Sequence, residues 1–284
     1  MMKSILVPTD FSKPASNAMH YALAMAKKEK AEIILAHAFD VNTITPYNTM
    51  PMIAEKIGRM ELEAEEKLKL LCAELRTSGI QCSYLNKLGD PIEIILSAVR
   101  EVHADLIIMG TRGASGIKEL LVGSNTVHII NRSTCPVLAV PARAVYKGIH
   151  KISYAVDYKA SDLTAFKKLT ALARVFHSEI TIVHAAGGEY NKLTEDTALE
   201  VFRKKVQKST GYDKINTLLV FGETPTIAVE KHIQQAMPDL IALSAHHRGV
   251  IASLFSSDMS EKLAHHTQIP LLAFHPDREK HSHH

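Results

Sequence analysis

The chain has 284 residues, of which 46% are hydrophobic and 22% charged, and its formal net charge is +3. Such values are typical of packed globular domains, and so small a charge does not favour nucleic acid as a partner. The sequence lacks a run of about 18 apolar residues and enters a strand pattern at once, without a signal-peptide core, so we expect a cytoplasmic protein with no membrane partner.

The first half alternates short apolar runs with helical patterns. The runs predict strands at residues 4–9, 32–38, 82–87, 105–109 and 136–140. The segments between them predict helices at 13–29, 53–78, 91–102 and 124–132. Strands rich in Ile, Val and Leu with little alternation are typical of sheets covered on both faces. Strands separated by helices of this length predict a doubly wound parallel sheet.

The second half repeats the pattern of the first. Asp10 and His37 are 27 residues apart, and so are Asp157 and His184. Several apolar segments recur in the same order, which chance similarity does not readily produce. The sequence therefore predicts an α/β protein of two tandem doubly wound domains, each a five-stranded parallel sheet flanked by helices. We expect domains at 1–143 and 149–276, and a disordered histidine-rich tail at 277–284.

A glycine-bearing loop follows the fourth predicted strand. Gly110 and Gly113 are separated by two residues, and nine residues lie between Gly113 and the pair Gly123-Ser124. Glycine allows positive φ and close backbone approach, and the helix N-terminus after the loop favours an anion. The spacing is neither the Walker A pattern nor Gly-x-Gly-x2-Gly. Because Asp10 also follows a strand, both segments are expected at the carboxyl edge of the sheet, where such folds bind ligands.

These segments carry a family resemblance. The loop, the opening Lys3-Ser-Ile-Leu-Val-Pro-Thr-Asp-Phe-Ser12 and the closing Cys135-Pro-Val-Leu-Ala-Val-Pro141 resemble the universal stress protein family over residues 1–141. The resemblance implies an adenine nucleotide alpha hydrolase-like fold, a stress-response role and ATP as ligand, with or without magnesium. The positions that it implies for nucleotide binding are Pro8, Asp10, Ala38, Met109, Gly110, Arg112, Gly113, Gly123, Ser124 and Asn125.

Several of these residues have plain structural alternatives. Asp10 suits a turn or helix cap as well as a ribose or adenine contact, and Ser124 suits a helix N-cap. Met109 is a candidate for the core at a strand end, and Arg112 for a surface cation.

The second copy of the loop departs from the motif. At an offset of 134 residues the four motif positions hold Ser244, His247, Ser257 and Asp258. An aspartate at a phosphate-facing helix start repels an anion. We therefore expect the second domain not to bind ATP in the same way, while another ligand stays open.

Histidine and cysteine side chains are the candidates for metal binding in this sequence. The chain has 16 histidines, and His246, His247 and His275 are candidates for a zinc site, with surface histidines as the plainer interpretation. The three cysteines lack metal-ligand spacing and are predicted to be reduced, buried thiols, at positions Cys72, Cys82 and Cys135.

Three functions compete at this point. The first is an ATP-binding regulator or sensor; the second is a slow ATPase, for which no residue near the loop clearly supplies a base. The third is a scaffold that binds zinc or a small ligand through the second domain. The apolar last strands, at 136–140 and 270–274, are predicted to pair within the chain as an intramolecular pseudo-dimer, and association of two chains stays open.

Overall fold

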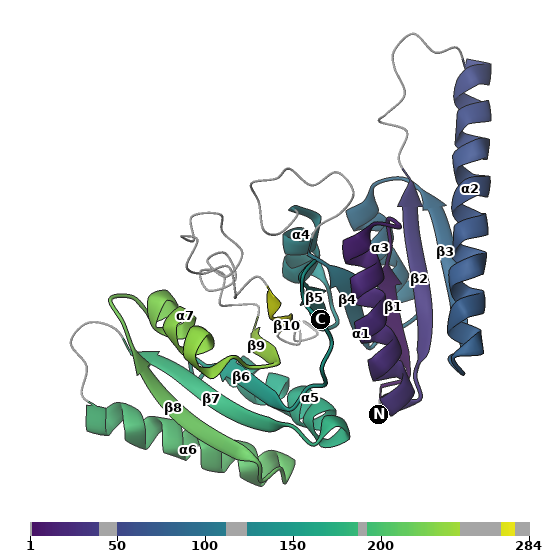
Figure 1. Cartoon of the computed structure of the whole chain (residues 1–284). Helices are drawn as coiled ribbons and strands as arrows, with labels where there is room; N and C mark the ends of the chain where they lie inside the picture. The colour runs from purple at the N-terminus through teal and green to yellow at the C-terminus, as the bar shows by residue number, and fades with distance from the viewer. Residues whose placement is uncertain (1, 40–49, 112–123, 187–191, 245–267, 276–284) are drawn as a thin grey trace, which may run out of the picture. The chain divides into compact units, whose positions relative to one another are not determined.

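A computed structural model of the chain describes residues 2–39, 50–111, 124–186, 192–244 and 268–275. Strands and helices alternate through both halves, as the sequence predicts (Figure 1). The elements of the first half are β1 (Ser4–Pro8), α1 (Lys13–Glu29), β2 (Glu32–Phe39), α2 (Met50–Thr77), β3 (Cys82–Leu88), α3 (Pro91–Glu101), β4 (Leu106–Gly110), α4 (Ser124–Arg132) and β5 (Val137–Val140).

The second half contains the same kinds of element in the same order. They are β6 (Lys151–Ala155), α5 (Ala160–Phe176), β7 (Glu179–Ala186), α6 (Lys192–Thr210), β8 (Ile215–Phe221), α7 (Pro225–Ala236), β9 (Leu240–Ser244) and β10 (Leu271–Phe274). The chain forms two compact units, the first ending at Val137 and the second beginning at Leu138. The predicted boundaries at 143 and 149 remain predictions.

The strands of each unit are parallel. In the first unit the order is β3-β2-β1-β4, and the backbone N–H of Ile107 in β4 donates to the carbonyl of Pro136, directly before β5. In the second unit the order is β8-β7-β6-β9-β10. In each order the chain first builds outward on one side of the first strand and then crosses to its other side. The predicted doubly wound α/β fold is therefore confirmed.

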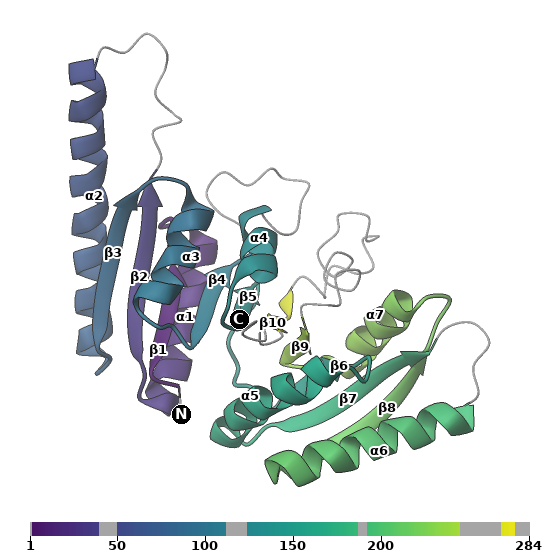
Figure 2. The ribbon, with the colours of Figure 1, turned by 180° about the vertical axis from the view of Figure 1, so that it is seen from behind.

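Helices cover both faces of the sheet in the first unit. Helices α1 and α3 lie on opposite faces, as Figure 1 and the reverse view in Figure 2 show. The middle residues of β1, β2 and β4 are buried, with Leu6, Leu35 and Ile107 fully inaccessible. Covering on both faces explains why these strands lack an alternation of apolar and polar residues.

Helix α1 shows how the local sequence sets an element's bounds. Ser12 caps its start by accepting from the N–H of Ala15 at 3.4 Å, and Lys30 ends it in the left-handed region with φ of 58°. The helix buries an apolar stripe that includes Ala18, Ala22 and Met25.

Two cysteines depart from the prediction. Cys72 of α2 and Cys82 of β3 form a disulfide, with Cα atoms 5.3 Å apart. A helix that packs antiparallel on the strand following it brings such residues together, and their Cα separation lies in the ordinary disulfide range. The prediction of reduced thiols is thus wrong for this pair. Cys135 is a buried thiol, and Ser133 Oγ lies 3.6 Å from its sulfur.

Within the described residues, no helix is both long and apolar enough to cross a membrane.

Candidate functional site

The carboxyl ends of β1, β2 and β4 lie at one edge of the first unit's sheet. Pro8, the last residue of β1, is paired with Ala36 of β2, and β4 runs parallel to β1 on its other side. Because β2 and β3 lie to one side of β1 and β4 to the other, the connections change direction between β1 and β4. Open parallel sheets bind ligands at such a point.

The β1–α1 turn is held by its own backbone and by Asp10. The N–H of Thr9 donates to the carbonyl of Ala36 at 2.9 Å, and Asp10 Oδ1 accepts from the N–H of Ser12 at 3.0 Å. This side-chain bond to the backbone two residues on is an Asx turn. The structural role that sequence reasoning left open for Asp10 is therefore real, and it fixes where the half-buried carboxylate lies.

Gly110 ends β4 where the first turn of α1 crosses it. A Cβ built on Gly110 would lie 2.9 Å from both the carbonyl carbon and the oxygen of Pro14. The φ of Gly110 is not among the positive values of the described glycines. Close approach, rather than positive φ, is thus the reason for glycine here.

The start of α4 is tied to the same point. Thr126 Oγ1 donates to the carbonyl of Gly110 at 3.1 Å, so β4 holds the first turn of α4 against its end. Ser124 and Asn125 begin α4, and both are exposed. The first turn of α4 contains no acidic residue, and the N–H groups of a helix start favour an anion.

Of the other positions predicted to bind the nucleotide, some lie within the described residues and some outside them. Met109 is 6% exposed and belongs to the core, which was its alternative interpretation. Pro8 is buried at the end of β1, and Ala38 is half-buried near the end of β2. Arg112, Gly113 and Gly123 lie outside the described residues.

Sequence reasoning missed an aromatic and basic group beside Asp10. Phe11 has a φ of 62°, and its ring centroid lies 4.6 Å from that of His37 on β2. Lys67 of α2 places its ammonium 5.2 Å from the centroid of the Phe11 ring. Burial lowers the pKa of His37 below its usual value, outweighing the Thr9 carbonyl and Asp10, which raise it. The only signal in the sequence was the repeated spacing between Asp10 and His37.

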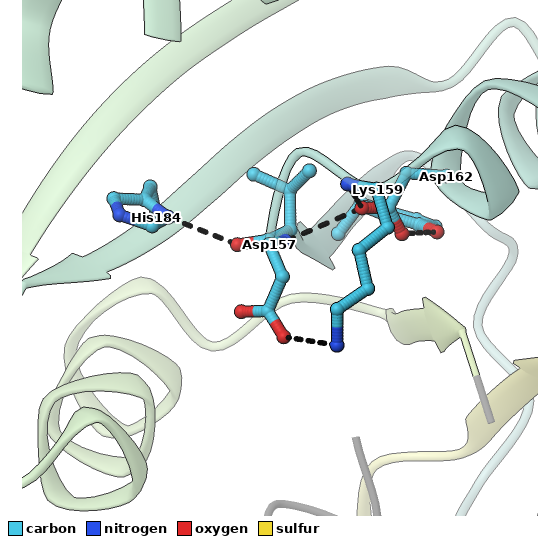
Figure 3. A network of polar contacts seen from close by, with 6 residues as sticks. Asp157, Lys159, Asp162 and His184 are labelled. Carbon is cyan, nitrogen blue, oxygen red and sulfur yellow. Dashed lines mark hydrogen bonds and ion pairs between the residues drawn. The ribbon is translucent and has the colours of Figure 1, made fainter. Parts of the chain in front are cut away.

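The corresponding edge of the second unit is built differently (Figure 3). Asp157 follows β6, and its carboxylate lies 3.5 Å from the ammonium of Lys159. Asp162, only 1% exposed, accepts from the hydroxyl of Tyr154 at 2.9 Å and from the N–H of Lys159 at 3.0 Å. Asp162 lies in the first turn of α5, and its carboxylate caps the helix by accepting from the N–H of the N-cap residue Lys159. The buried carboxylate is thus satisfied by donors of the protein itself. Burial and the neighbouring Asp162 raise the pKa of Tyr154 well above its usual value.

At the second unit's equivalent of Gly110, Ser244 is buried, and its hydroxyl has no hydrogen-bond partner among the described residues. Of the three zinc candidates, His246 and His247 lie outside the described residues, and His275 follows β10. Among the residues that the structure describes, no three His, Cys, Asp or Glu side chains are placed to hold a metal ion.

Comparison with known proteins then assigns the family. The model of the Universal stress protein family matches residues 1–141 and 148–275. The chain belongs to the universal stress protein family. It is a tandem member, because the family model matches twice in succession. The stress-response role of the family extends to it at that general level.

Individual relatives agree with this assignment. A universal stress protein of Methanocaldococcus jannaschii is 30% identical over 154 residues, which cover 49% of this chain and 95% of that protein. One of Thermus aquaticus is 34% identical over 140 residues, covering 49% and 99%. A universal stress protein structure from Archaeoglobus fulgidus covers 96% of this chain and 98% of its own, with a TM-score of 0.74 and 21% identity. At that identity the likeness shows the fold alone.

Proposed function

We propose that the first unit binds ATP, with magnesium, at the carboxyl ends of β1 and β4, and that the protein senses the nucleotide rather than consuming it. The observation that carries the proposal is the meeting, at the direction change of the sheet, of Asp10, the end of β4 and the start of α4. A carboxylate suits ribose or amino donors, and the N–H groups of a helix start suit phosphate oxygens.

The proposal extends to residues implied by the family resemblance. Gly113, Gly123 and Arg112 would complete the phosphate loop, and Ala38 would lie against the adenine. The second unit is proposed not to bind ATP. At the equivalent edge of that unit, the buried carboxylate of Asp162 already accepts from the N–H of Lys159. The ammonium of Lys159 in turn pairs with the carboxylate of Asp157.

The test separates the two roles of Asp10. Asp10→Asn keeps an oxygen that can accept from the Ser12 N–H, so the turn survives, while the negative charge and one acceptor are lost. Loss of a charged hydrogen bond predicts an ATP affinity weaker by about 10- to 100-fold. Asp157→Asn is the matched control in the second unit, and its affinity should equal that of the wild type.

Isothermal titration with ATP and magnesium provides the affinity and the number of sites. One site per chain, weakened by Asp10→Asn alone, supports the proposal. Equal weakening by Asp157→Asn, or none by Asp10→Asn, contradicts it. Accumulation of ADP in the same mixture would assign turnover instead of sensing, and sedimentation of the same sample would show whether chains associate beyond the single tandem chain.

A further inference from the structure

The last backbone group before Asp10 is held by a side chain of the neighbouring strand. The ring nitrogen Nδ1 of His37 lies 2.7 Å from the carbonyl oxygen of Thr9. The N–H of Thr9 donates to the carbonyl of Ala36, the residue directly before His37 on β2. Both backbone groups of Thr9 are thus fixed by β2, one by the main chain and one by an imidazole.

The residue after Asp10 is fixed by the same imidazole. Phe11 adopts a φ of 62°, a conformation that is unfavourable for a bulky residue and persists only where the surrounding structure enforces it. Its ring packs on His37 at 4.6 Å between centroids, with the planes inclined by 40°. Asp10 therefore lies between two residues that both contact His37, and its carboxylate has little freedom to turn away.

The second unit repeats this arrangement with different neighbours. Nδ1 of His184 lies 3.0 Å from the carbonyl of Val156 (Figure 3), which directly precedes Asp157. Tyr158, at φ of 59°, packs its ring on His184 at 4.4 Å. The N–H of Val156 is held by Val183, as that of Thr9 is by Ala36. The histidine contact is therefore a common feature of the turn after the first strand in both units.

The protonation of His37 follows from its partner. A carbonyl oxygen only accepts hydrogen bonds, so Nδ1 must carry a proton to bind it. Burial holds the pKa of His37 below its usual value, so the ring is neutral near pH 7 and Nδ1 is its one donor. The donor is therefore committed to the Thr9 carbonyl.

We infer that His37 is a positioning residue for nucleotide binding: its Nδ1–H fixes the Thr9 carbonyl and its ring fixes Phe11, so that the Asp10 carboxylate is held in place before the ligand arrives. This rests on the proposed ATP site. Pre-organised groups bind more tightly because they need not be ordered on binding.

The experiment uses a donor series at His37 in the full chain. His37→Asn places an amide N–H near the position of Nδ1, His37→Gln places one near Nε2, and His37→Leu provides none. His184→Leu is the matched control, since it removes the same hydrogen bond in the second unit. The ATP affinity and the hydrogen exchange of the amides at 9–12, without nucleotide, are measured for each.

The net value of one hydrogen bond predicts that His37→Leu binds ATP about 3- to 10-fold more weakly. His37→Asn should recover most of that loss. His184→Leu should leave ATP affinity unchanged while lowering the stability of the second unit. Exchange at residues 9–12 should quicken in His37→Leu and return towards the wild-type rate in His37→Asn.

Each contrary result overturns a definite statement. Wild-type affinity in His37→Leu refutes positioning, and equal weakening in His37→Asn and His37→Leu refutes the hydrogen bond as its means. If His37→Leu does not fold, tighter binding by His37→Gln than by His37→Asn is the refuting result. If the wild-type chain binds no ATP, the proposed function fails. Unchanged hydrogen exchange of the amides at 9–12 in the variants would then separately refute the statement that His37 fixes the turn around Asp10.

Discussion

Replacing Gly110 with alanine tests how closely α1 approaches the end of β4. The added Cβ would meet the carbonyl carbon and oxygen of Pro14 at 2.9 Å, and the Cβ of the same residue at 3.1 Å. These atoms belong to the first turn of a helix whose inner face is packed on the sheet. They cannot rotate aside as the end of a flexible side chain can, so the helix must shift.

The expected cost follows from this geometry. The φ of Gly110 lies outside the left-handed region, so alanine adds no backbone strain and the destabilising effect is steric. Overpacking against atoms that cannot move freely costs about 1–3 kcal/mol. For a unit of this size that corresponds to a fall of roughly 2–12 °C in its melting temperature.

Calorimetric melting measures the change, and Gly58→Ala is its control. Gly58 lies within α2, and a Cβ there would meet nothing within 4 Å. Alanine in a helix interior is favoured over glycine by about 0.5–1 kcal/mol, so this variant should melt higher. A Gly110→Ala chain as stable as the wild type, beside a Gly58→Ala chain that is stabilised, would refute the close approach of α1 to β4.

Three further outcomes are expected. Burial lowers the folded-state pKa of His232 from 6.5, so as pH falls below about 6.5 the unfolded chain binds the proton first and stability is lost. In His232→Gln the melting temperature of the second unit should therefore fall less between about pH 7 and pH 5. An equal fall in the melting temperatures of the variant and the wild type would contradict this. Asp162→Asn weakens the acceptor of the buried cap of α5 and should cost the second unit about 1.5–3 kcal/mol in urea denaturation without changing ATP affinity, whereas an unchanged midpoint would show that the charge is not needed. Thiol titration of the denatured, unreduced chain should find Cys135 alone, because Cys72 and Cys82 are paired, and three thiols would exclude the disulfide.

The predicted site was partly accessible from the sequence. Asp10 and Gly110 were recognisable because strand ends, glycine spacing and a following helix are local patterns. Their structural tasks were not recognisable. The contact of Gly110 with Pro14 joins residues 96 positions apart in the chain, and the bond between His37 and Thr9 depends on the register of β1 with β2.

The sequence by itself determined the two-unit α/β architecture. Apolar runs and helical stripes are set by nearest neighbours along the chain, so the bounds of helices such as α1 and strands such as β2 follow closely from them. The repeat of the pattern determined that the fold is built twice, and the family model matches both copies.

Only the tertiary structure decided which side chains face one another. It placed Phe11 on His37 and Lys67 over Phe11, and it paired Cys72 with Cys82. These contacts depend on strand order and on the packing of a helix against a strand. The spacing of residues along the chain determines neither the strand order nor the helix packing, because many registers and packings satisfy the same apolar pattern.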